Sequence, residues 1–109
     1  MNADCRLAVY GSLAPGKSNH HQLAGLAGEW RAGVVRGERV EAGWGTAGGF
    51  PGLKLDADGG EVAVQVFTSA DLPQHWARLD RFEGADYRRV TTEVMTADGP
   101  LAAQVYVVG

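Results

Sequence analysis

The chain has 109 residues, of which 45% are hydrophobic, and this is enough apolar material for the core of one domain spanning residues 1–109. The formal net charge of −3 gives no basic field that would favour nucleic acid or an anionic membrane surface as a partner. No apolar run approaches the roughly 20 residues of a transmembrane helix, and a single cysteine excludes an internal disulfide and a cysteine-based metal site. We therefore expect a cytoplasmic protein.

The first predicted element is a short buried strand over residues 7–10, which read L-A-V-Y. Gly11 and Ser12 end this strand and begin a loop. Successive backbone N–H groups in such a loop can hold an anion without any charged side chain. The loop is therefore a candidate binding site, and the alternative is a glycine-rich surface turn.

Residues 11–18, G-S-L-A-P-G-K-S, also fit the phosphate-binding pattern G-x-x-x-x-G-K-[ST]. A nucleotide-binding protein of this type also needs an apolar strand that ends in an aspartate near the magnesium ion. No apolar run in this chain ends in that way, and Pro15 removes one N–H from the loop. Nucleotide binding through Lys17 stays the less favoured alternative.

The middle of the chain predicts a short helix over residues 20–27, with Asn19 as its N-cap and Gly28 as its stop. From Trp30 to Glu41 the apolar residues alternate with one slip in phase. Such a slip is typical of one bulged strand or of two short strands broken near Gly33. The sequence then predicts a loop, an edge segment, a turn and a strand over residues 43–49, 50–53, 56–60 and 62–67.

The clearest helix is predicted from Asp71 to Phe82, and Gly84 follows as its stop. Its apolar residues recur on one face, at Leu72, Trp76, Leu79 and Phe82. Two strands joined by a turn follow, over residues 87–96 and 101–108. Together these elements predict an α+β fold, with a small mixed, largely antiparallel six-stranded sheet that curls towards a barrel, and two short helices.

Glu83 is the second candidate for chemistry. It follows Phe82 at the C-terminal end of the predicted helix, where the helix dipole and the edge of the core both disfavour a charged carboxylate. A raised pKa would suit a general base, although position alone slightly favours a solvated glutamate at a helix end. The three histidines, His20, His21 and His75, do not have the spacing of a chelate, so we expect no metal site.

Four segments resemble, in the same order, the motifs of the γ-glutamylcyclotransferase-like family, and especially of its γ-glutamylamine cyclotransferase-like members. They are Y-G-S-L at residues 10–13, Asn19 and His20 with Leu23, F-P-G-L at residues 50–53, and L-D-R-F-E-G at residues 79–84 followed by Y-R-R at residues 87–89. The chain differs from the family pattern at Ala14-Pro15, where a basic residue is common, and at Phe67, where a tyrosine is common.

The resemblance implies a six-stranded, barrel-like α+β fold that binds a small γ-glutamyl compound without a cofactor. An exposed edge strand of the sheet would allow a homodimer as well as a monomer. It implies that Tyr10, Gly11, Ser12 and Leu13 bind the γ-glutamyl group and that Glu83 is the base. The reaction would release 5-oxoproline and an amine. Tyr87 and Tyr106 either line the substrate site or pack in the core. The alternative is a protein of the same fold that binds small carboxylates without converting them.

Overall fold

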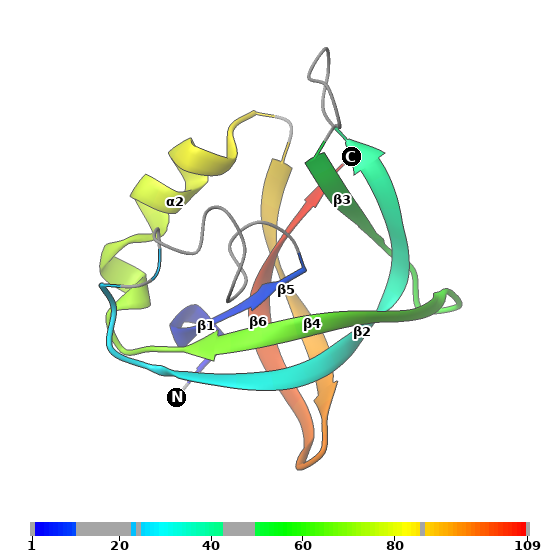
Figure 1. Cartoon of the computed structure of the whole chain (residues 1–109), viewed down its shortest axis with the longest axis horizontal. Helices are drawn as coiled ribbons and strands as arrows, with labels where there is room; N and C mark the ends of the chain where they lie inside the picture. Colours follow the sequence, from blue (N-terminus) through cyan, green and yellow to red (C-terminus); the bar gives the residue numbers. More distant parts are fainter. Residues whose placement is uncertain (1, 11–22, 24, 43–49, 86, 109) are drawn as a thin grey trace.

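The computed structural model describes residues 2–10, 23, 25–42, 50–85 and 87–108 (Figure 1). In chain order its elements are η1 (Ala3–Cys5), β1 (Arg6–Val9), β2 (Glu29–Ala42), β3 (Phe50–Leu55), β4 (Gly60–Thr68), η2 (Leu72–Gln74), α2 (Trp76–Glu83), β5 (Tyr87–Thr96) and β6 (Gly99–Val108). The predicted α+β class with six strands is confirmed. Of the helix predicted over residues 20–27, Leu23 is helical and residues 25–27 are not, while residues 20–22 and 24 lie outside the described residues.

The six strands form one sheet in the order β3-β2-β4-β1-β6-β5. A further pairing between Val34 of β2 and Met95 of β5 closes five of these strands into a barrel, which leaves β3 as an extra strand beside β2. β1 and β6 are parallel, whereas every other pairing is antiparallel. The mixed, largely antiparallel barrel that the sequence predicted is therefore confirmed.

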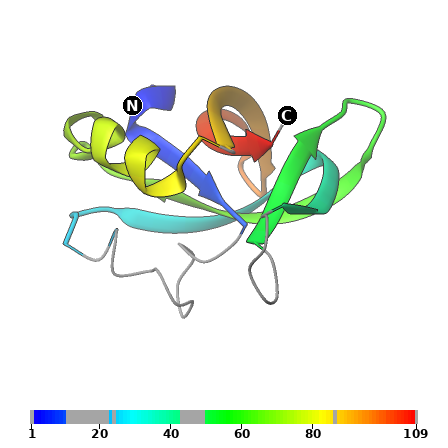
Figure 2. The same ribbon diagram turned by 90° about the horizontal axis from the view of Figure 1, so that it is seen from above.

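Successive side chains of a strand point to opposite faces, and in this sheet both faces carry buried residues. One cluster of buried residues, the inner cluster, fills the barrel: Ala8, Val35, Leu53, Val62, Val64, Val66, Val94, Ala103, Val105 and Val107. The other, the outer cluster, joins the sheet to α2: Leu7, Val9, Leu23, Phe67, Leu72, Trp76, Leu79 and Tyr106. Figures 1 and 2 both show α2 outside the ring of strands.

β2 is one unbroken strand, so the bulge or break predicted near Gly33 is wrong. Its register with β4 stays constant from the pair Glu29 and Thr68 to the pair Gly37 and Gly60. The slip in the pattern has another cause. Trp30, near the start of β2, packs on Phe67 in the outer layer with ring centroids 4.9 Å apart, whereas Val35 faces the barrel interior. β2 therefore keeps one register but buries one face near its start and the opposite face further along.

Gly33 instead allows the barrel to close. A Cβ atom at this position would lie 2.6 Å from Cγ1 of Val94 and 3.0 Å from the carbonyl oxygen of Met95, both on β5. The absence of a side chain thus lets β5 approach β2 beside the pair that joins them, Val34 and Met95.

The helix predicted from Asp71 to Phe82 is shorter than expected. Residues 72–74 form the 3₁₀ turn η2, and the α-helix begins only at Trp76. Leu72, Trp76 and Leu79 are buried as the pattern predicted, but Phe82 is 38% exposed, so its placement in the core is wrong. Phe82 lies in the last turn of α2 and does not belong to the outer cluster.

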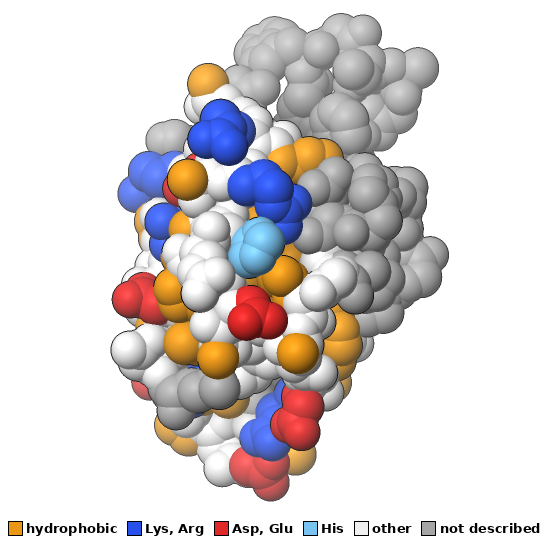
Figure 3. Space-filling model, turned by 90° about the vertical axis from the view of Figure 1, so that its left-hand side faces the viewer, with side chains coloured by type: hydrophobic (Ala, Val, Ile, Leu, Met, Phe, Trp, Pro, Cys, Tyr) orange, Lys and Arg blue, Asp and Glu red, His pale blue; other side chains and the backbone are white. Residues whose placement is uncertain are grey.

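The face that carries α2 shows hydrophobic side chains lying between charged side chains of both signs (Figure 3). Within the described residues, Phe82, Leu55 and Met95 are the large hydrophobic residues that are exposed. No helix in this part of the chain combines the length and the hydrophobicity needed to span a bilayer.

Candidate active site

The end of α2 leads directly into β5 at the upper end of the barrel in Figure 1. Gly84 ends the helix with φ +85° and ψ −178°, a conformation that almost only glycine adopts. Its N–H donates to the carbonyl oxygen of Asp80 at 3.1 Å, and the N–H of Tyr87 donates to the carbonyl oxygen of Gly84 at 3.3 Å. This tight connection fixes Glu83, the last residue of α2, beside the first residue of β5.

The Glu83 side chain is largely buried, and burial raises the pKa of its carboxyl group from 4.5 to about 7. Within the described part of the chain, no hydrogen bond or ion pair satisfies this carboxylate. Protonated and ionised forms therefore coexist near neutral pH. A carboxylate in this condition can accept and return a proton, as a general base requires.

Tyr10 directly follows β1 and lies close to Glu83. Its hydroxyl donates a hydrogen bond of 2.6 Å to the carbonyl oxygen of Tyr106 on β6. Burial raises the pKa of the Tyr10 phenol well above its ordinary value, and the nearby Tyr87 and Glu83 raise it further. The fold therefore brings Tyr10, Glu83 and Tyr87 together from the ends of β1, α2 and β5.

Tyr106 has a different setting from Tyr10. Its ring is buried in the outer cluster, and its hydroxyl donates a 2.7 Å hydrogen bond to Oδ1 of Asp80 on α2. Burial and the neighbouring Asp80 raise the pKa of this phenol above its ordinary range. The hydroxyl is thus occupied within the protein and helps to hold α2 against β6.

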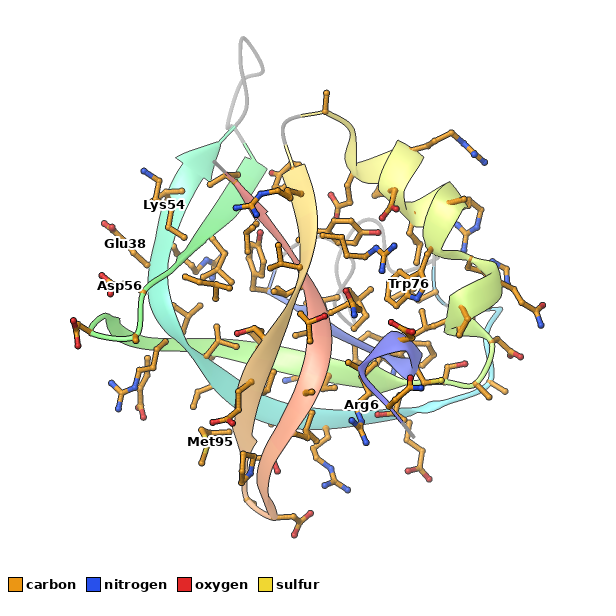
Figure 4. The ribbon with its side chains drawn as sticks, turned by 180° about the vertical axis from the view of Figure 1, so that it is seen from behind. Arg6, Glu38, Lys54, Asp56, Trp76 and Met95 are labelled. Carbon is orange, nitrogen blue, oxygen red and sulfur yellow. The ribbon has the colours of Figure 1, made fainter. Side chains whose placement is uncertain are left out.

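Arg89 completes this attachment of α2. Its Nε donates to Oδ1 of Asp80 at 2.9 Å and its Nη1 to Oε1 of Gln104 at 3.3 Å, while its guanidinium lies 4.5 Å from the centre of the Trp76 ring. Burial works to raise the pKa of Asp80, but hydrogen bonds from Arg89 and Tyr106 outweigh it and hold that pKa below its usual range. Figure 4 shows Trp76 on the inner side of α2, towards the sheet.

Sequence reasoning gave no role to Asp80 and Arg89, although both lie in the segments that resemble family motifs. Arg89 and Tyr106 are directly opposite each other on β5 and β6, and both contact Asp80. This arrangement depends on the pairing of two strands and on the position of α2. The signals in the sequence were the motif segments and the opposite charges nine residues apart.

Gly11, Ser12 and Leu13, and with them the whole G-x-x-x-x-G-K-[ST] pattern, lie outside the described residues. The anion-binding loop thus stays a prediction. Among the residues that the structure does describe, no three His, Cys, Asp or Glu side chains are grouped so as to hold a metal ion. His75, one of the three histidines considered as metal ligands, accepts a 3.3 Å hydrogen bond at Nδ1 from Nε of Arg78.

A family model described as "Gamma-glutamyl cyclotransferase, AIG2-like" matches residues 7–109, almost the whole chain. The chain belongs to this γ-glutamyl cyclotransferase, AIG2-like family. The resemblance drawn from the sequence motifs is thereby confirmed. Among the curated proteins compared with it, none matches.

Solved structures similar to this family member include YkqA from Bacillus subtilis, with 29% identity and a TM-score of 0.73. The match covers 100% of this chain but only 36% of YkqA, so the chain spans about a third of that protein. An AIG2-like protein from Mus musculus has 22% identity and a TM-score of 0.76, over 96% of this chain and 77% of that one. A structure titled "Gamma-glutamyl cyclotransferase" has 16% identity and a TM-score of 0.73, over 95% of this chain and 66% of that one. The last two likenesses show the fold.

Proposed function

We propose that the protein is a γ-glutamyl cyclotransferase that converts a γ-glutamyl amino acid or amine into 5-oxoproline and the free amine. The observation that carries this proposal is the largely buried carboxylate of Glu83, whose pKa is raised to about 7, next to Tyr10 and Tyr87. Family membership supports the same chemistry. The role of Glu83 as the base comes from the motif resemblance and from this environment together.

In the proposed reaction, Glu83 accepts a proton from the α-ammonium group of the substrate. The resulting amine attacks the γ-carbonyl carbon of the same molecule, and the bond from that carbon to the leaving nitrogen breaks. The α-nitrogen loses two protons in all, and the leaving amide nitrogen gains two. The amine is therefore released as an ammonium ion, and Glu83 returns to its starting form. Because both reacting groups belong to one molecule, holding the substrate folded supplies much of the rate.

The test is 5-oxoproline release from a panel of γ-glutamyl amino acids and γ-glutamyl amines by wild type and Glu83→Gln. Loss of the base should reduce kcat by about 10²–10⁴-fold. Glu38→Gln is the matched control because Glu38 is exposed and points away from the barrel (Figure 4). Full activity of Glu83→Gln would contradict the assigned role.

The same panel separates catalysis from binding alone. Wild-type protein that binds γ-glutamyl compounds in calorimetry but releases no 5-oxoproline from any of them would be a binding protein of this fold. That outcome would overturn the proposed reaction and leave the binding site in place.

A further inference from the structure

β2 and β3 continue beyond the barrel as a two-stranded arm with a clear inside and outside. Glu38 and Lys54 are directly paired across the arm and point away from the molecule (Figure 4). The next pair along, Arg39 and Leu53, must point to the opposite face, because side chains alternate along a strand and paired residues share a face. Leu53 is 0% exposed in the inner cluster, so that face is the one that continues the barrel interior.

Arg39 is exposed on this face, and its charge acts on Tyr10. Tyr10 packs on the inner cluster to which Leu53 belongs. The positive charge of Arg39 acts on the phenol by lowering the pKa of Tyr10 against the larger effect of burial. In the described part of the chain, no carboxylate or carbonyl group binds the Arg39 guanidinium, whereas Arg31, Arg36 and Arg89 each have such a partner.

Building on the proposed function, we propose that Arg39 binds a carboxylate on the leaving group and so makes the protein select γ-glutamyl amino acids over simple γ-glutamyl amines. An arginine suits this role because its guanidinium can donate two parallel hydrogen bonds to one carboxylate. A γ-glutamyl amino acid carries such a group on the nitrogen that leaves, and a simple γ-glutamyl amine does not.

The α-carboxylate of the glutamyl group is a poorer partner for Arg39. It shares a carbon atom with the α-amine, and that amine must lie at the Glu83 carboxylate for proton transfer. A guanidinium that held the α-carboxylate would therefore be close enough to Glu83 to lower its pKa. The pKa shift of Glu83 is caused by burial, and the charge of Arg39 acts on Tyr10 instead. We therefore assign Arg39 to the leaving group and not to the α-carboxylate.

The decisive substrates are γ-glutamylalanine and γ-glutamylethylamine, which differ by one carboxylate. We expect wild type to prefer γ-glutamylalanine in kcat/KM by about tenfold or more, the usual worth of a charged hydrogen-bond pair. Arg39→Gln should remove this preference by raising KM for γ-glutamylalanine and leaving γ-glutamylethylamine unchanged. Arg39→Lys keeps the charge and should restore part of the preference.

Two controls remove one positive charge elsewhere. Lys54→Gln acts on the outer face of the same arm, and Arg88→Gln acts on β5, where alternation with Val90 places Arg88 on the inner face. Both should keep the wild-type preference. The proposal would be overturned if Arg39→Gln lowered kcat/KM equally for both substrates. It would also be overturned if Arg88→Gln, and not Arg39→Gln, removed the preference for γ-glutamylalanine.

Binding measurements separate this inference from the proposed reaction. Calorimetry compares the binding of the two substrates to Glu83→Gln and to Glu83→Gln/Arg39→Gln. Glu83→Gln should bind γ-glutamylalanine about tenfold more tightly than γ-glutamylethylamine, and the double variant should bind both equally. If wild type releases no 5-oxoproline but this difference in binding is present, the reaction fails and the role of Arg39 stands. If both substrates are converted with equal efficiency, the reaction stands and the role of Arg39 fails. Absence of both conversion and binding would overturn both.

Discussion

Replacing Glu83 by glutamine should make the folded protein more stable at neutral and alkaline pH. Burial raises the pKa of Glu83 from 4.5 to about 7, so the native state keeps a proton that the unfolded chain releases between these two pH values. Where the unfolded state binds fewer protons, stability falls as the pH rises. The wild-type protein therefore loses stability through this window, whereas a neutral glutamine at position 83 removes the loss.

The difference between a pKa of 4.5 and one of about 7 corresponds to about 3 kcal/mol, because one pKa unit is worth about 1.4 kcal/mol. Part of the Glu83 side chain still contacts solvent, so we expect about 2 kcal/mol after allowing for screening by water. The free energy of unfolding of Glu83→Gln minus that of wild type should therefore grow by this amount from pH 4.5 to about pH 8.

Urea denaturation of both proteins at the two pH values, followed by tryptophan fluorescence, measures this difference. Glu38→Gln provides the control, since Glu38 is exposed on the outer face of β2 and its replacement should leave the pH dependence of wild type unchanged. A difference between Glu83→Gln and wild type that stays constant with pH, within about 0.5 kcal/mol, would refute a buried carboxylate at this position.

Three further predictions follow from the same structure. The kcat/KM for 5-oxoproline release should rise along an acid limb centred near pH 7 as Glu83 loses its proton, and a flat profile across that pH in stopped assays would contradict the role of the base. Leu79→Ala should lower the free energy of unfolding by about 3 kcal/mol in urea titrations, because Leu79 is 0% exposed in the outer cluster. Gly84→Ala should cost about 1–3 kcal/mol in thermal unfolding, because φ is +85° there. The loss should come from the backbone alone, since nothing lies within 4 Å of the added Cβ. An unchanged Tm in that variant would count against the strained turn.

The strands could be predicted because one face of each strand meets a core, and this leaves an alternating pattern in the sequence. The sequence indicated a sheet that curls towards a barrel, but the contact that closes it left no such pattern. That contact depends on the approach of β5 to Gly33, a glycine that also fits a bulge. The helix was predicted too long because Leu72 and Trp76 have helical spacing although a 3₁₀ turn ends between them.

Glu83 could be selected from the sequence because a carboxylate at a helix C-terminus is unfavourable for local reasons, although Phe82, the neighbour expected in the core, is exposed. The attachment of α2 through Asp80, Arg89 and Tyr106 could not be derived in this way. Each of these residues is unremarkable within its own element, and they meet only after β5 and β6 have paired and α2 has packed on the sheet. Arg39 is a similar case, because only the pairing of β2 with β3 puts it on the same face as Leu53 and the inner cluster on which Tyr10 packs.

The central position of β1 has a consequence for how the chain folds. β1 pairs with β4 on one edge and with β6 on the other, through the pairs Leu7 with Gln104 and Ala8 with Val105. The first strand of the chain must therefore wait for the sixth before its second edge is covered. Such distant pairings slow folding, because closing the long loop between the partners costs chain entropy before any stabilising contact forms. During synthesis on the ribosome, β1 would keep an open edge until β6 has emerged, so we expect this barrel to close only after translation of β6.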